Sequence, residues 1–150
     1  MDITVTRAID APADRVWSLQ IRHEEWPSHL PNFRRIERID HGPFAVGSSA
    51  RVTQPMLGTV VWTVDALDES PARRTFSWSG TSKGIRYVAS HEVVPEGATR
   101  STLTLRLRAE GRGLALFAPI ARRVVSRTIA AEAEAFDRWA HEAPSPADAS

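Results

Sequence analysis

Cysteine is absent from the 150-residue sequence, and lysine occurs once, as Lys83. The lack of cysteine excludes disulfide bonds, thiolate nucleophiles and thiolate metal ligands. The five histidines are scattered, without the paired helical spacing that a zinc site uses, so neither a metal nor another cofactor is predicted. No apolar run approaches the ~20 residues of a membrane-spanning helix, and the N-terminus lacks a signal-peptide pattern. We therefore expect a cytoplasmic protein without an integral membrane segment.

A strong excess of charge of either sign is also missing, because the formal net charge at pH 7 is +1. This balance gives no reason to expect nucleic acid as a partner. The chain length fits one domain, which we place at residues 1–142. Residues 143–150 are rich in Ala, Ser and Pro and contain no large apolar side chain, which predicts a disordered tail.

The clearest pattern in the chain is a long amphipathic helix, predicted over residues 113–142. At 100° per residue, apolar side chains gather on one broad side of this stretch and charged ones on the other. The predicted buried side comprises Phe117, Ile120, Ala121, Val124, Val125, Thr128, Ala135, Phe136 and Trp139.

The rest of the sequence alternates mainly with the two-residue period of strands. A first strand at residues 3–9 is followed by a helix, for which Asp10 is the expected cap, and by a second short helix or turn that Pro27 breaks. The strand pattern then recurs at residues 33–40, 48–54, 59–67, 73–79, 85–94 and 99–110. This order predicts an α+β domain in which a curved antiparallel sheet folds around the terminal helix.

Strand alternation also predicts which side chains face that helix. Val60, Trp62, Val64 and Ala66 fall on one face of the strand at residues 59–67, and Phe76 and Trp78 share a face of the next. In the strand at residues 85–94, the inward set is Tyr87, Ala89, His91 and Val93.

Three local patterns accompany this order: Ile9–Trp17 (IDAPADRVW), Trp26–Pro31 (WPSHLP) and Gly97–Arg100 (GATR). Together with the long terminal helix, they resemble the START-like (SRPBCC) superfamily of helix-grip, Bet v 1-like proteins. The likeness is to the bacterial polyketide cyclase/dehydrase and lipid-transport group. It implies a seven-stranded antiparallel sheet wrapped around the helix, two short helices after the first strand, and a cavity between sheet and helix.

The ligand-binding residues that we predict for such a cavity combine inward-facing rings with a few polar groups. A hydrogen-bonded wall residue remains the alternative for His91, and a rim position with a solvated hydroxyl group is the alternative for Tyr87. For Gln54 the alternative is a solvent-exposed strand end, and for Glu132 it is a position beyond the rim. Aromatic side chains that simply fill the core are the alternative to an open cavity. The predicted set is Gln54, Trp62, Trp78, Tyr87, His91, Thr128 and Glu132.

Three functions fit these features. The preferred one is binding of a small hydrophobic molecule such as a lipid, a polyketide or an isoprenoid, by a monomer or a homodimer. The second is a cyclase or dehydratase that uses His91, Tyr87 and Glu132 as acid and base groups. The third is a protein-interaction module with a vestigial cavity, suggested by apolar residues at loop and helix-start positions. These residues are Met56, Leu57, Leu114 and Leu116.

Overall fold

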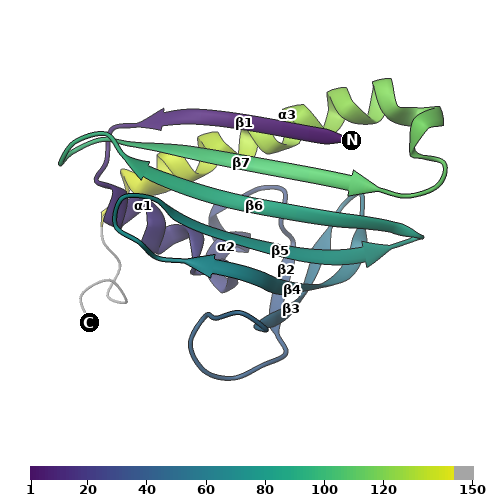
Figure 1. Ribbon diagram of the computed structural model, residues 1–150, viewed down its shortest axis with the longest axis horizontal. Helices are drawn as coiled ribbons and strands as arrows, with labels where there is room; N and C mark the ends of the chain where they lie inside the picture. Colours follow the sequence, from purple (N-terminus) through teal and green to yellow (C-terminus); the bar gives the residue numbers. More distant parts are fainter. Residues whose placement is uncertain (144–150) are drawn as a thin grey trace.

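The computed structural model describes residues 1–143, except for the side chains of residues 115–118. Residues 144–150 of the expected tail, and the side chains of Leu116 and Phe117, therefore lie outside the described part. The element order is the predicted one, strand, short helices, six strands and a long helix (Figure 1). The elements are β1 Asp2–Ile9, α1 Ala13–Gln20, η1 His23–Glu25, α2 Trp26–His29, β2 Arg35–Arg38, β3 Ser49–Gln54, β4 Gly58–Asp68, β5 Arg74–Ser82, β6 Ile85–Pro95, β7 Ser101–Glu110 and α3 Leu114–Ala140.

The seven strands form one antiparallel sheet in the order β1-β7-β6-β5-β4-β3-β2. Each strand from β2 to β7 pairs with its neighbour in sequence, and β1 closes the order by pairing with β7. The helices α1, α2 and α3 lie together on one side of the curved sheet (Figure 1). An α+β helix-grip architecture with a seven-stranded sheet is thus confirmed.

The sheet register brings the predicted inward residues together. Phe76 pairs with His91, and Trp78 pairs with Ala89, so side chains from neighbouring strands project side by side toward the helices. The prediction for Ala66 was wrong, because the β4–β5 register shifts between Val64 and Ala66. One extra residue at such a bulge reverses the alternation, and Ala66 is exposed as a result.

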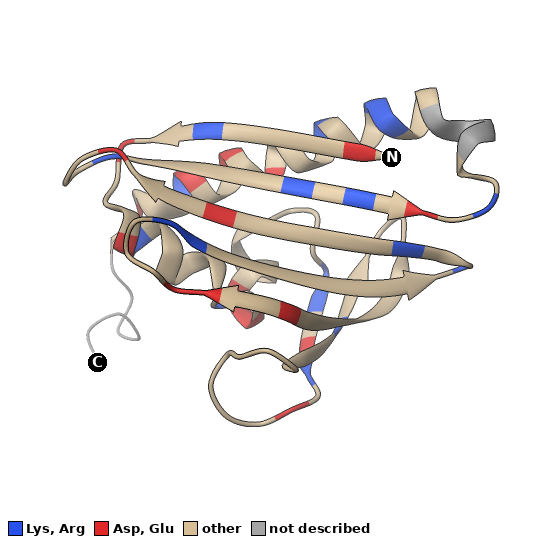
Figure 2. Cartoon of the chain, in the orientation of Figure 1, with Lys and Arg blue, Asp and Glu red and all other residues tan. Residues whose placement is uncertain are grey.

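Helix α3 has 27 residues and lies within the predicted range of residues 113–142, but its buried stripe is narrower than the sequence suggested. Ile120 is 74% exposed and Val124 is 38% exposed, although both were expected on the buried side. The inward direction is set by Ala121 and Val125, and each of the two exposed residues precedes one of these by a rotation of 100°. Figure 2 shows basic residues along the N-terminal half of α3 and charges of both signs in its C-terminal half.

Two expectations for the first helices need correction. Asp10 does not cap α1, whose N-cap is Pro12 without a side-chain hydrogen bond. The Asp10 carboxylate instead forms an ion pair of 2.8 Å with Arg100. Pro27 does not break the second helical segment either, since it lies in the first turn of α2, where a missing backbone N–H leaves no bond unmade.

The N-terminal strand is tied to α3 by a charged pair across the interface. The Nε atom of Arg7, on the helix-facing side of β1, lies 2.7 Å from Oδ2 of Asp137. This contact joins the first and last elements of the domain. No helix within residues 1–143 is long and apolar enough to cross a membrane.

Candidate ligand-binding cavity

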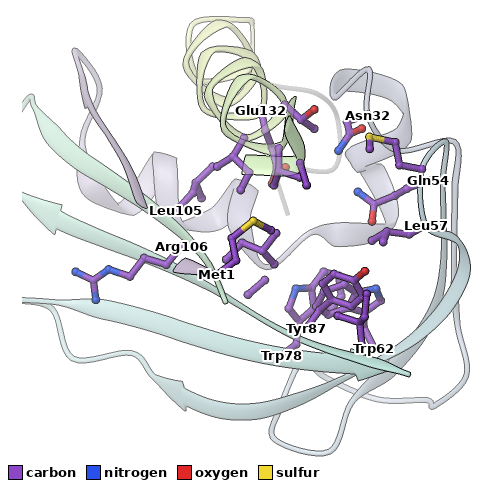
Figure 3. A pocket seen from close by; sticks show the side chains of 18 of the residues that line it. Met1, Asn32, Gln54, Leu57, Trp62, Trp78, Tyr87, Leu105, Arg106 and Glu132 are labelled. Atoms are coloured by element: carbon purple, nitrogen blue, oxygen red, sulfur yellow. The ribbon is translucent and has the colours of Figure 1, made fainter. Parts of the chain in front are cut away.

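A cavity of about 480 Å³ lies between the concave face of the sheet and α3. The strands β4, β5 and β6 supply the rings of Trp62, Trp78 and Tyr87 on the sheet side, and α3 supplies Glu132 on the opposite side (Figure 3). The segment after α2 and the turn between β3 and β4 complete the wall. The main apolar lining residues are Met1, Phe33, Leu57, Ile85, Ala89, Leu105, Leu107, Ala121, Val125 and Ile129.

The sheet side of the cavity is a cluster of three aromatic rings from adjacent strands. The centroid of Trp62 lies 5.3 Å from that of Trp78 and 6.3 Å from that of Tyr87. Both indoles are buried, whereas Tyr87 is half-buried. The Nε1–H of Trp62 is buried and has no hydrogen-bond acceptor within residues 1–143. The result is a rigid and mainly apolar wall of tilted rings.

His91 is enclosed by rings and held by a single polar partner. Its imidazole stacks between Trp26 and Phe76, with centroid distances of 5.2 and 4.6 Å. Its Nδ1 lies 2.8 Å from Oε1 of Gln20, whose Nε2 donates to the carbonyl of Val16 at 3.2 Å. Because this arrangement makes Oε1 the acceptor, Nδ1 carries the proton and Nε2 keeps its lone pair. Burial lowers the pKa of His91 to about 3, so the ring is neutral.

Glu132 is a buried carboxyl group in a predominantly apolar surrounding. Its side chain is 8% exposed and makes no hydrogen bond or ion pair within the described part of the chain. Burial raises the pKa of Glu132 to about 8, because the charged form loses its hydration without gaining a partner. One turn earlier on α3, the hydroxyl of Thr128 donates to the carbonyl of Val124 at 3.0 Å and is thereby engaged in its own helix.

Three further uncharged polar residues line the cavity. Figure 3 shows Asn32 and Gln54 on the same side of the cavity, with the Tyr87 ring below them. All three residues are half-buried, and none makes a side-chain hydrogen bond to another described residue. Burial raises the pKa of Tyr87 above its ordinary value, so the phenol stays protonated at neutral pH. The cavity therefore offers uncharged amide and hydroxyl groups beside its rings.

The sequence matches one known family over nearly its whole length. Residues 1–140 match the family described as polyketide cyclase / dehydrase and lipid transport. The chain belongs to this family. No protein of curated function matches it significantly.

Solved structures agree with the family assignment. A hypothetical protein from Helicobacter pylori superposes with a TM-score of 0.83 at 11% identity, covering 94% of this chain and 88% of the other. The Zhui aromatase/cyclase from Streptomyces sp. R1128 gives a TM-score of 0.77 at 20% identity and 93% coverage of both chains. A START superfamily protein from Mycobacterium smegmatis gives 0.73 at 16% identity, covering 93% and 96%. The START-like fold that the sequence resembled is confirmed.

The seven sequence-predicted residues of this family member all line the same cavity. Their role in ligand binding stays a prediction. Asn32 was missed because it lies in an irregular segment after α2, where no periodic pattern indicates the direction of a side chain. The pairing of Gln20 with His91 was not foreseen either. Among residues 1–143, no group of three His, Asp or Glu side chains is arranged to hold a metal ion.

The apolar residues considered for a protein interface have different environments. Met56 is 62% exposed, whereas Leu57 is half-buried against the core. Leu114 lines the cavity rather than pointing fully to solvent. These residues therefore do not share one exposed surface, which weakens the case for a continuous apolar interface.

Proposed function

We propose that this protein binds a small, mainly apolar molecule in the cavity between its sheet and α3. The observation that carries the proposal is the cavity of about 480 Å³, lined by Trp62, Trp78 and Tyr87 together with aliphatic side chains. A volume of this size falls within the usual range of ligand pockets, roughly 300–1,000 Å³. Lipids, polyketides and isoprenoids all contain members of this size and polarity.

The polar groups support binding of a ligand that is apolar along most of its length. Asn32, Gln54, Tyr87 and Glu132 lie among rings and aliphatic side chains, and none makes a hydrogen bond to another described side chain. Such a lining stabilises an apolar body by burial and orients one polar end by hydrogen bonding. Membership of a family that includes lipid transport is consistent with this role.

A cavity-filling variant tests the proposal directly. Ala121→Phe adds a ring to a lining position on α3, and Ala131→Phe adds the same ring at an exposed position on that helix. The neutral probe N-phenyl-1-naphthylamine, whose fluorescence rises in apolar surroundings, should bind the parent protein and Ala131→Phe alike. Binding to Ala121→Phe should be at least about tenfold weaker, a difference of ~1.4 kcal/mol. Equal binding to the two variants would refute the cavity as the site.

A second measurement identifies the natural ligand class. Native mass spectrometry of the purified protein should reveal a mass excess that disappears on denaturation, and the released molecule can then be analysed. Retention of the same excess by Ala121→Phe would place that molecule outside the cavity.

A cyclase- or dehydratase-type reaction is the second candidate function. The specific observation is Glu132, a carboxyl group whose raised pKa suits proton transfer near neutral pH. The fold is shared with an aromatase/cyclase, which gives this chemistry a precedent on the scaffold. His91 supports it less, because burial among rings lowers its pKa to about 3 and makes it a weak base. Full turnover of a polyketide-like substrate by Glu132→Gln and Tyr87→Phe would exclude the mechanism.

A further inference from the structure

Five polar side chains that line the cavity carry no charge near neutral pH, namely those of Asn32, Gln54, Tyr87, His91 and Glu132. Asn32 and Gln54 are amides, and the pKa of Tyr87 lies above its ordinary value. The pKa of His91 is far below neutral and that of Glu132 is raised to about 8. A ligand that enters this space exchanges water for neutral hydrogen-bonding groups and apolar surface.

No buried cationic side chain is available in the described lining to receive an anionic ligand. Arg106 and Arg112 contribute to the lining, but both are exposed, and Figure 3 shows the Arg106 side chain pointing away from the cavity. On β7, the inward positions on either side of Arg106 are Leu105 and Leu107. The amino group of Met1 donates to the carbonyl of Ala109 at 2.8 Å. None of these cations forms an ion pair with Glu132 within residues 1–143.

We propose that the cavity selects apolar ligands whose polar end is an uncharged carbonyl or hydroxyl group, which forms a hydrogen bond with Glu132. Ligands that end in a carboxylate are rejected. This inference rests on the binding function proposed above. The carboxyl group of Glu132 projects from α3 toward the ring wall and has no protein partner in the described chain. In its protonated form it donates one hydrogen bond and also accepts. A ligand carboxylate would place a desolvated charge beside an acid, with no buried cation to compensate it.

This selection separates two kinds of molecule that the family description alone leaves together. Free fatty acids and other apolar carboxylates have a suitable apolar chain, but their polar end is charged. Ketones, esters, phenols and alcohols of the same size have an end that Glu132 can bind. The ligand class is therefore defined by the charge of its polar end as much as by its apolar surface.

Two probes with the same ring system test the selection. The ketone 2-acetylnaphthalene and the carboxylate 2-naphthoate differ mainly in the charge of the polar end, and their binding is measured by isothermal titration calorimetry. At about pH 7, the ketone should bind more than about tenfold more tightly than the carboxylate. If the carboxylate binds equally well or better, the charge selection is wrong while the binding function stands. If neither probe binds, the proposed function fails as well.

Variants at two acidic positions of α3 assign the selection to Glu132. Glu132→Gln keeps a hydrogen-bond donor but cannot ionise, and Glu134→Gln is the matched change on the exposed side of the helix. Raising the pH from about 7 to about 9 should weaken ketone binding to the parent protein and to Glu134→Gln about tenfold, because Glu132 ionises and loses its proton. Glu132→Gln should show no such loss between about pH 7 and about pH 9, whatever its affinity at about pH 7.

The other titratable groups near Glu132 make this control informative. His91 on β6 is neutral in the interval because burial lowers its pKa to about 3, and burial raises the pKa of Tyr87 above its ordinary value, which favours the protonated phenol. Arg106 on β7 and Arg112 after it are unchanged in every variant. The amino group of Met1 on the β1 side is present in every variant. If the loss of affinity persists in Glu132→Gln, a group other than Glu132 causes it, and the assignment is overturned.

Discussion

The two ends of the space between sheet and helices are built from the same elements but filled very differently. At one end, Trp26, Phe76, His91 and Phe136 are buried and make ring contacts with one another. At the other end, Trp62, Trp78 and Tyr87 form one wall of an open cavity, and α3 forms the opposite wall. Trp26 stands between the two ends, because it lines the cavity and also packs on Phe136.

The difference follows from where the short helices lie. The helices α1 and α2 insert between the sheet and the C-terminal half of α3, and their side chains fill the space there. The N-terminal half of α3 has no such third layer beneath it. The aromatic side chains of the strands do not fill the space between the sheet and this half of α3. They can therefore contact a ligand instead of other side chains of the protein. The same sheet thus supports a packed core at one end and a binding site at the other.

The largest expected difference between the two ends is in the free energy of unfolding, when an aromatic ring at the packed end is truncated. Phe136 is fully buried, so Phe136→Ala should lower the free energy of unfolding by roughly 3–5 kcal/mol. Val125 is half-buried and faces the cavity, and Val125→Ala should cost less than about 1 kcal/mol because few contacts are lost. Urea denaturation of both variants without added ligand measures the contrast. Similar losses would mean that the open end is as tightly packed as the closed one.

A second prediction concerns Glu132, which lines the cavity, and the dependence of the free energy of unfolding on pH. Burial raises the pKa of Glu132 from 4.5 to about 8, so between these values the folded protein holds a proton that the unfolded chain has released. The contribution of Glu132 to stability is therefore fully present below about pH 4.5 and is lost as the pH rises to about 8. Glu132→Gln lacks this loss, and relative to the parent it should gain roughly 2–4 kcal/mol between about pH 5 and about pH 8.

The matched variant for this measurement is Glu134→Gln, which removes an exposed carboxylate from the same helix. Its stability relative to the parent should change by less than about 0.5 kcal/mol over the same interval. Denaturant melts at several pH values give both differences. A constant difference between Glu132→Gln and the parent would show that Glu132 is solvated or paired in solution.

The order of elements and the inward faces of most strands could be predicted because both depend on local periodicity. Phe76, Trp78, Tyr87 and His91 face the helices as their alternation indicated. Ala66 did not follow the pattern, since a bulge depends on the pairing with β5 and leaves no clear mark in one strand. The helix was also predicted well in length, but the width of its buried stripe depends on how much of it the sheet covers.

The candidate site could be predicted as a set of residues but not as an arrangement. Polar side chains on apolar faces identified Gln54, His91 and Glu132 as unusual, and all three line the cavity. The partner of His91 could not be inferred, because Gln20 lies 71 residues away and the contact depends on how α1 packs on β6. Whether the rings filled the core or bordered a cavity depended on the distance between sheet and helix, which no local pattern encodes.

The last prediction concerns the narrow buried stripe of α3 and includes the smallest expected effect. It compares the truncation of two isoleucines on this helix. Ile129 is 8% exposed and Ile120 is 74% exposed, although only Ile120 was expected on the buried side of the helix. Ile129→Ala should lower the free energy of unfolding by about 2–4 kcal/mol, whereas Ile120→Ala should change it by less than about 0.5 kcal/mol. Chemical denaturation of the two variants gives the comparison. A loss at Ile120 close to that at Ile129 would mean that the N-terminal half of α3 is covered in solution, by a second copy of the chain or by closure over the cavity.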